Sequence, residues 1–290
     1  MKATTNPKFL AAMFAGSMLS LAATYVQAAT IDLTPAGSTA NFSTDSTGGA
    51  ATFQNPTSLS SIVSGTGVFN PFLTVQANKE ESGFSTDNDS KLPLDTKRSN
   101  WLNTFSISQL DLNSGSALFY LDINEPSANT DKDPRKSWIS LEELRIYVTP
   151  SAADVMLNDD DVDFLSDPDP LNPDPKSLVS VASRLGWTEV YDLNSNILSL
   201  DYNALGNGSG RPDLEFLLPA RVFSGFDPSY RVVFASRFGS TDESDAGYEE
   251  WAFKANDSVI PPVTTVPEPA SLALLGIGLM GLAAARRRRS

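Results

Sequence analysis

Residues 117–123 read ALFYLDI, and this stretch indicates the fold class of the chain. It is short, apolar and rich in aromatic and branched side chains, and the turn-forming residues Asn124 and Pro126 follow it. These features are typical of a β-strand that ends in a turn. Similar stretches recur at residues 72–76, 104–108, 143–148, 188–191, 197–202, 214–218, 230–235 and 248–253. Because the apolar residues repeat with a period of two almost throughout, the sequence predicts an all-β chain.

These strands predict one large ectodomain over residues 64–255. Short strands joined by long polar connections are typical of an antiparallel β-sandwich or jelly roll. The preceding segment, residues 29–63, is rich in Thr, Ser and Gly. It is predicted either to add edge strands at residues 31–33 and 51–53 or to form a loosely ordered arm. The sequence shows no repeat of fixed period, which argues against a propeller or a solenoid.

The composition limits the chemistry that the chain can perform. Its 290 residues include 35 Asp and Glu against 21 Lys and Arg, for a formal net charge of −14. Phosphate binding needs a basic surface, so no nucleic acid partner is expected. An acidic surface suits divalent cations or serves solubility. The chain has no Cys and no His, which excludes disulfides, thiolate and imidazole metal ligands and a Ser-His-Asp triad.

Residues 1–28 have the layout of a signal peptide, which is expected to form an N-terminal signal helix. Lys2 and Lys8 supply a basic start, and an apolar run over residues 9–23 follows. Small side chains at Val26 and Ala28 suit signal peptidase, so cleavage is predicted after Ala28, with Ala29 as the alternative. The sequence therefore predicts export across the inner membrane.

The other end reads VPEPASLALLGIGLMGLAAARRRRS over residues 266–290, after a Pro-rich linker at residues 256–265. An apolar run at residues 270–285 predicts a short hydrophobic helix, near the lower length limit for a membrane span. The cluster Arg286, Arg287, Arg288 and Arg289 would stop in the cytoplasm under the positive-inside rule. The tail is therefore either a lasting anchor or a signal that holds the precursor in the inner membrane transiently and is then removed.

The motif Pro267, Glu268 and Pro269, together with the apolar run and the Arg cluster, resembles the PEP-CTERM sorting signal. The resemblance implies a Gram-negative bacterium that makes extracellular polysaccharide. It also implies that the membrane protease-transpeptidase exosortase recognises the motif and removes the tail, so that these residues are substrate residues and not catalytic ones. The stretches at residues 65–69, 121–125 and 247–251 are similar to the ectodomains of many PEP-CTERM precursors, for which no activity carries over.

Oxygen-bearing side chains near the strand ends are candidate calcium ligands. Calcium binds six to eight hard oxygen atoms, and β-sandwiches often supply them from strand ends. The candidate set is Asp122, Asn124, Glu125, Asp213 and Glu249. The alternative is that these side chains cap turns and cover polar faces. The acidic run at residues 159–163 lacks the Gly and Glu that an EF-hand needs at its sixth and twelfth positions, so a solvated loop is expected there.

Three functions follow from this reading. The first is a non-enzymatic protein of the cell surface or the extracellular matrix, associated with exopolysaccharide or biofilm, with no established cofactor and extracellular polysaccharide as a candidate partner. The second is a carbohydrate-binding module, stabilised by calcium, in which some of the four Trp side chains stack on sugars. The third is a glycoside hydrolase or lyase that uses a pair of carboxylates.

Overall fold

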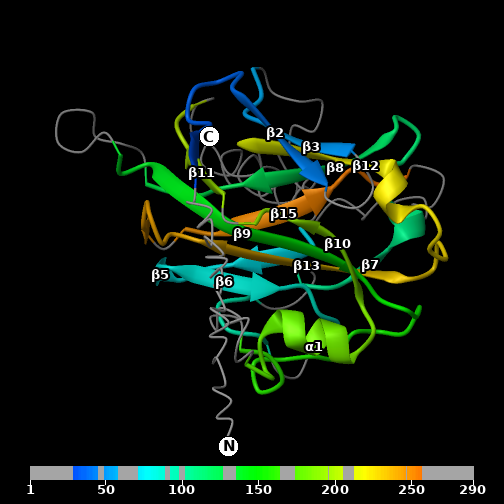
Figure 1. Cartoon of the computed structure of the whole chain (residues 1–290). Coiled ribbons are helices and arrows are strands. Elements are labelled where there is room, and N and C mark those ends of the chain that lie inside the picture. Colours follow the sequence, from blue (N-terminus) through cyan, green and yellow to red (C-terminus); the bar gives the residue numbers. More distant parts are fainter. Residues whose placement is uncertain are drawn as a thin grey trace, which may run out of the picture.

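Two β-sheets packed face to face make up the folded domain (Figure 1). The computed structural model describes residues 29–44, 49–57, 71–88, 92–97, 102–126, 135–163, 174–194, 196–204, 212–245 and 247–256. Within these ranges almost every strand pair is antiparallel, as the sequence predicts for a β-sandwich. The exception is the pair that β1 forms with β11, which is parallel.

The β9 sheet has seven strands, and its longest is β9. Its main order is β1 (Thr30–Asp32), β11 (Ile197–Asp201), β9 (Trp138–Val148), β13 (Arg231–Phe238) and β6 (Glu81–Phe84). Two shorter strands complete it, because β10 (Thr188–Asp192) pairs with β9 and β7 (Phe105–Ser106) pairs with β13.

The β8 sheet has six strands and lies behind the β9 sheet in Figure 1. Its order is β2 (Thr39–Thr44), β3 (Gly49–Gln54), β12 (Leu214–Pro219), β8 (Ser116–Asp122), β15 (Glu249–Phe253) and β4 (Leu73–Val75). A separate ladder joins β5 (Asn78–Lys79) to β14 (Ser244–Asp245). The described helices are short: 3-10 turns at Ile107–Gln109 and Ala220–Phe223, and α1 at Leu178–Arg184.

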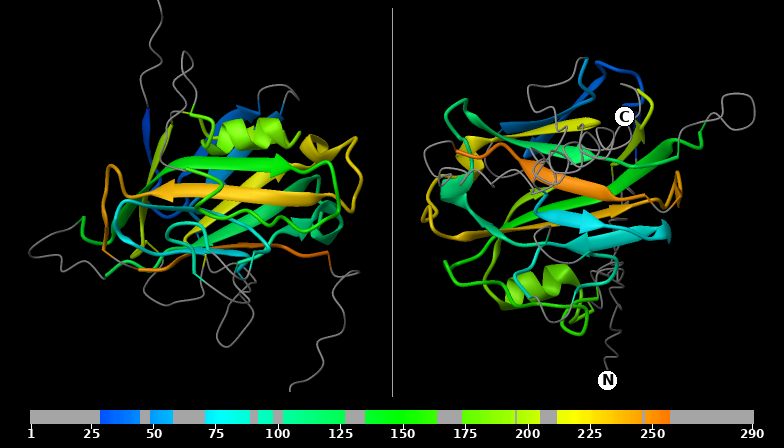
Figure 2. Two further views of the ribbon diagram at one scale, coloured as in Figure 1. Left: turned by 90° about the horizontal axis from the view of Figure 1, so that it is seen from below. Right: turned by 180° about the vertical axis from the view of Figure 1, so that it is seen from behind.

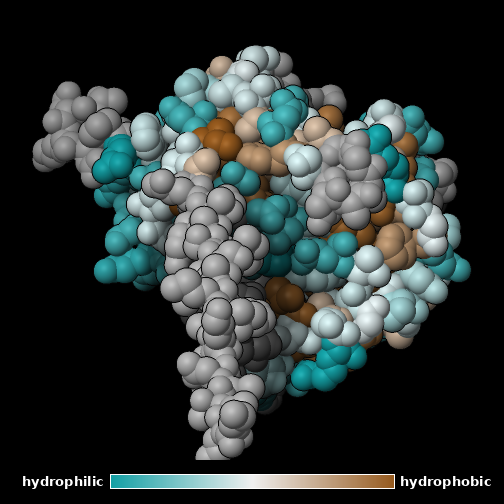
Figure 3. All heavy atoms as spheres, in the orientation of Figure 1, coloured by the Kyte–Doolittle hydropathy of each residue, from teal (hydrophilic) through white to brown (hydrophobic). Residues whose placement is uncertain are grey.

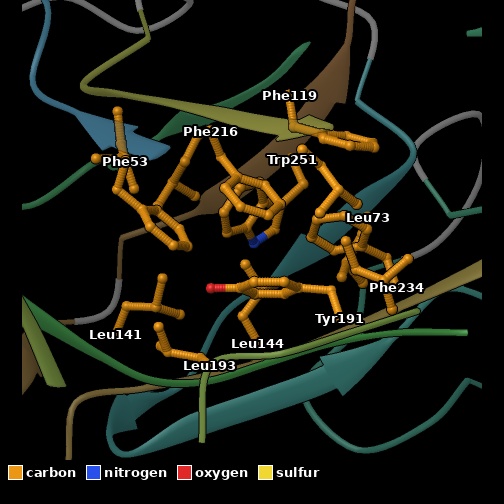
Figure 4. Close-up of a cluster of buried hydrophobic side chains, with 14 of the residues drawn as sticks. Phe53, Leu73, Phe119, Leu141, Leu144, Tyr191, Leu193, Phe216, Phe234 and Trp251 are labelled. Carbon is orange, nitrogen blue, oxygen red and sulfur yellow. The ribbon is translucent and has the colours of Figure 1, made fainter. Parts of the chain in front are cut away.

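Aromatic rings fill the space between the two sheets (Figure 4). Phe53, Phe119 and Phe216 come from the β8 sheet and pack on one another with ring centroids 4.4–5.7 Å apart. Trp251 of β15 crosses to the β9 sheet, where its ring lies 5.0 Å from that of Phe234 and its Nε1–H donates to the Ser236 hydroxyl at 3.2 Å. The core is therefore held by contacts between the sheets and not only by the ladders within them.

Helix α1 covers part of the outer face of the β9 sheet (Figure 2, left). Leu178 and Val181 of the helix are buried against Phe84, Tyr147 and Val233 of three neighbouring strands. The helix begins at the Ser177 cap, whose side chain accepts from the Ser180 N–H. Because α1 covers part of their outer face, strands β9 and β13 have buried side chains on both faces there, which agrees with their apolar runs at residues 146–148 and 232–235.

A network of ion pairs occupies another part of the same outer face. The Arg145 guanidinium contacts Glu143 at 2.7 Å and both Glu189 and Asp192 at 3.0 Å. In the space-filling view, hydrophilic residues (teal) gather over the middle of this face, where β9 runs (Figure 3). These pairs satisfy polar groups on a half-buried sheet surface and bring acidic side chains together around one cation.

The Thr, Ser and Gly-rich segment that begins at residue 29 belongs to the sandwich. Strand β1 lies at the edge of the β9 sheet, as predicted, but β3 lies between β2 and β12 and is not an edge strand. The edge is formed by β2, which the sequence did not reveal because its residues TANFST carry little apolar pattern. The burial of Phe53 against Phe216 is the contact that places β3 inside the sheet. The described part of this segment is therefore not a loosely ordered arm.

The predicted helices of the two chain ends, within residues 1–28 and 270–285, lie outside the described residues. Within the described ranges, no helix is both long enough and apolar enough to cross a membrane.

Replacing Gly239 by Ala is expected to destabilise the domain by about 2 kcal/mol more than the same change at Gly225. Both glycines have a left-handed backbone, with φ values of +87° and +94°. A Cβ at Gly239 would lie 1.8 Å from the Lys79 carbonyl oxygen, whereas a Cβ at Gly225 would meet nothing within 4 Å. Urea unfolding of the two variants measures the difference, and equal losses would contradict a steric role for Gly239.

Candidate functional site

Three glutamates converge at one edge of the sandwich, and we call them the glutamate cluster. Glu81 begins β6 of the β9 sheet, Glu249 begins β15 of the β8 sheet, and Glu125 lies just after β8. Their exposed fractions are 1%, 0% and 3%. Buried glutamates are uncommon unless they are paired or bind a ligand, so this cluster is the leading candidate for a functional site.

Strand geometry directs Glu81 and Glu249 toward each other. Glu249 lies two residues before Trp251, so both side chains point to the core face of β15. Glu81 lies two residues before Gly83, where an added Cβ would be 2.8 Å from a methyl group of Val75 on β4. Val75 is in turn the register partner of Glu249. The two carboxyl groups therefore face each other across the gap between the sheets.

The loops around the cluster supply a few backbone donors. The Ala77 N–H donates to Glu81 Oε2 at 2.6 Å, and the Asp245 N–H donates to Glu125 Oε2 at 2.9 Å. The Ser244 hydroxyl lies near both of these carboxyl groups and helps to lower the pKa of each. Four oxygen atoms remain without a hydrogen-bond partner: Glu81 Oε1, Glu125 Oε1 and both carboxylate oxygens of Glu249. The protein therefore supplies hydrogen-bond donors to only some of the carboxylate oxygens of the cluster.

Burial raises the pKa of all three glutamates. It raises the pKa of Glu249 well above the usual 4.5, and the adjacent Glu81 and then Glu125 raise it further, although the nearby Asn124 N–H lowers it slightly. It raises the pKa of Glu125 to about 7. It also raises the pKa of Glu81, to which the charge of Asp95 adds, against the lowering effect of the Glu249 side chain. No cation is among the causes of these shifts, so burial in this cluster favours the protonated form of each carboxyl group more than exposure to water would.

A close backbone approach keeps the loop after β8 against the start of β15. A Cβ added at Gly247 would lie 2.1 Å from the Asn124 carbonyl oxygen and 3.2 Å from Glu249 Oε1. Only glycine fits there without a shift of the backbone. The Asn124 side chain adds a hydrogen bond across the same gap, because its amide donates to the Tyr248 carbonyl at 2.8 Å. These contacts bring Glu125 close to Glu249.

The structure divides the five predicted calcium ligands between two places. Glu125 and Glu249 lie in the glutamate cluster, and Asn124 lies beside it, with its side-chain amide donating to the Tyr248 carbonyl. Asp122 pairs in register with Glu250, on the opposite face of the β8 sheet from Glu249. Asp213 lies beside Asp122, where its carboxylate accepts from the Ile123 N–H at 3.0 Å and burial raises its pKa. Among the described residues, no group of three or more Asp or Glu side chains could hold a metal ion as they are placed. Calcium binding therefore stays a prediction, and the predicted set is not one site.

Glu81 is the cluster residue that the sequence did not reveal. Its neighbours, NKEES at residues 78–82, read as a polar loop, and no strand was predicted there. The inward direction of Glu81 depends on the pairing of β6 with β13, which is a contact between distant parts of the chain. The alternation of Glu249 and Glu250 was predictable, and the structure confirms that they point to opposite faces.

The other candidate residues occupy ordinary structural positions. Trp251 is fully buried, Trp187 packs on Tyr147 with ring centroids 6.1 Å apart, and Trp138 is half-buried. Trp101 lies outside the described residues. In the acidic run, Asp159, Asp160 and Asp163 are exposed. Hydrogen bonds within the loop, such as that from the Asn158 N–H to the Asp161 carboxylate at 3.1 Å, hold its conformation. The described part of this run is a solvated turn.

The match between this chain and a known protein family lies in the C-terminal tail. Residues 265–289 match the family model of the PEP-CTERM protein-sorting motif, in agreement with the resemblance found from the sequence. The match includes Pro267, Glu268 and Pro269 and the Arg286–Arg289 cluster. No curated protein and no solved structure matches the chain. The chain therefore carries a PEP-CTERM sorting motif, which supports export, sorting to the cell envelope and processing of the tail by exosortase.

Proposed function

We propose that the mature domain is a non-enzymatic protein of the cell surface or extracellular matrix in a Gram-negative bacterium that makes exopolysaccharide. The observation that carries this proposal is the sorting motif at residues 265–289, which follows a folded β-sandwich. In this proposal the tail enters the inner membrane transiently, and exosortase removes it. The part that then works outside the cell is the acidic sandwich.

The burial of the glutamate cluster supports a role without catalysis. A carboxylate-based glycosidase needs an acid and a second carboxylate that a sugar can reach. The acid groups that the sandwich brings together with strongly raised pKa values, Glu125 and Glu249, are almost completely buried. The proposal is tested by incubating the exopolysaccharide with the exported protein. The chain length of the polysaccharide should stay unchanged. If the unaltered protein shortens the polysaccharide and the Glu249→Gln variant does not, the protein is instead a glycoside hydrolase or lyase.

Replacing Pro267, Glu268 and Pro269 together by Ala is expected to abolish processing of the tail. Exosortase then lacks its substrate motif, so the precursor should remain in the inner-membrane fraction with Arg286–Arg289 attached. The matched control is Thr264→Ala in the linker, which should be processed normally. Cell fractionation and mass spectrometry of the C-terminal peptide measure the outcome. A surface form of the unaltered protein that retains the Arg cluster would mean that the tail is a lasting anchor.

The position of β1 supports signal peptidase cleavage after Ala28. The Ile197 N–H donates to the Ala29 carbonyl at 3.0 Å, and this bond extends the pairing of β1 with β11. A cut after Ala28 keeps that carbonyl in the mature chain, whereas a cut after Ala29 removes it. We therefore propose Ala29 as the first residue of the mature protein, which mass spectrometry of the N-terminal peptide of the exported chain tests directly.

A further inference from the structure

We propose that the glutamate cluster binds one divalent cation of the calcium class, held by the carboxyl groups of Glu81, Glu125 and Glu249. This inference does not depend on the matrix role, since it concerns the inside of the sandwich. It also differs from the ligand set that the sequence predicts, because it adds Glu81 and leaves out Asp122, Asn124 and Asp213.

The first argument is the balance of charge. None of the ion pairs between described residues reaches Glu81, Glu125 or Glu249. A buried carboxylate without a partner is costly, and it is stabilised either by a proton or by a cation. A divalent cation balances two of the three negative charges while the carboxylates stay ionised. Protons, by contrast, convert the carboxylates into neutral acids.

The second argument is Glu249 itself. It is completely buried and points into the space beside Glu81, and neither of its oxygens has a hydrogen-bond partner of normal geometry, although the Asn124 N–H lies near. Glu81 and Glu125 each add one further oxygen without a partner, and the Ser244 hydroxyl lies between them. Carboxylate and hydroxyl oxygens are the hard ligands that calcium prefers, and the cluster contains no nitrogen or sulfur side chain that would favour another metal.

The third argument concerns what binding would change. In the arrangement described, the carboxyl groups of Glu81 and Glu249 lie against each other, and three acidic groups do not yet surround an ion. A glutamate can turn about three side-chain torsions while its strand stays in place. Binding would therefore reorient the side chains and join β6 of one sheet to β15 of the other. The cation would act as a clamp between the two sheets at this edge.

The test uses the exported, processed protein after treatment with EDTA, titrated with calcium chloride at pH 7.5. Calorimetry should give one site per chain, and saturation should raise the Tm by roughly 5–10 °C. The variants Glu81→Gln and Glu249→Gln should abolish this rise. They should also have a higher Tm than the unaltered protein in EDTA, because each replaces an acid group that burial destabilises, whether by a retained proton or a buried charge, with a neutral amide. Loss of calcium binding then cannot be attributed to misfolding.

Two matched controls separate the cluster from other acidic groups. Glu243→Gln removes an exposed charge next to Ser244, and Asp161→Asn alters the acidic turn. Both variants should keep the full calcium-induced rise in Tm. The proposal is overturned if calcium leaves the Tm of the unaltered protein unchanged. It is equally overturned if the rise survives in both glutamine variants of the cluster, or if Asp161→Asn alone abolishes it.

Discussion

Trp251→Ala is expected to lower the free energy of unfolding of the mature domain by about 4 kcal/mol. Trp251 is fully buried and is the largest of the fully buried side chains. Its ring fills the space between the two sheets beside Phe234, and its Nε1–H bonds to Ser236 on the facing sheet. Truncation leaves a cavity and removes the hydrogen bond of a buried hydroxyl, and both effects lower stability. Urea unfolding followed by fluorescence or circular dichroism measures the loss.

Two further variants divide this effect into its causes. Trp251→Phe keeps most of the ring volume but loses the hydrogen bond to Ser236, so it should cost about 1–2 kcal/mol. Trp187→Ala truncates a half-buried ring at the edge of the smaller core under α1 and should cost clearly less than Trp251→Ala. Equal losses for Trp251→Ala and Trp187→Ala would contradict the central position given to Trp251.

With divalent cations chelated, the free energy of unfolding is expected to fall as the pH rises from about 4.5 to above 7. Burial raises the pKa of Glu81, Glu125 and Glu249 in the folded state above the usual 4.5, to about 7 for Glu125. The folded chain then holds protons that the unfolded chain has already released. The stabilising effect is complete below the unfolded pKa and disappears as the pH passes each raised folded pKa. Each pKa unit corresponds to about 1.4 kcal/mol, so we expect a total loss on the order of several kcal/mol.

The measurement is a series of urea unfolding curves in EDTA between pH 4.5 and 8.5. Glu249→Gln should flatten the decline, because an amide does not titrate, and the exposed Glu243→Gln should leave it unchanged. Asp111 and Asp227 have lowered pKa values, through hydrogen bonds from Lys254 and the Ser229 N–H respectively, and they act in the opposite direction only at more acidic pH. A stability that stays constant over this range would mean that the cluster is not protonated in the folded chain.

Much of the fold was predictable because it depends on local pattern. The stretch ALFYLDI places Phe119 and Leu121 in the core, and the predicted strand ends agree with β8 to within one residue. The alternation that separates Glu249 from Glu250 is equally local, since it follows from strand geometry alone. Pattern of this kind defines which faces are apolar, and that is enough to predict a sandwich.

The parts that were missed depend on contacts between distant residues. Strand β2 has little apolar pattern and is a strand because it pairs with β3. Helix α1 is seven residues long, too short to be stable alone, and exists because the outer face of the β9 sheet covers its apolar side. The glutamate cluster was only partly predicted for the same reason. Glu125 follows one recognisable strand and Glu249 begins another, whereas Glu81 is positioned only by the pairing of β6 with β13.

The parallel pairing of β1 with β11 has a consequence for the order of events during export. Secretion delivers the chain from its N-terminal end, so β1 is among the first segments to reach the far side of the membrane. Its partner begins at Ile197, more than half of the chain length later. Until then β1 has no sheet to join, and the edge of the β9 sheet can close only late in translocation. The first strand to emerge is thus among the last to pair, and a chaperone on the far side of the membrane would have its longest access to this segment.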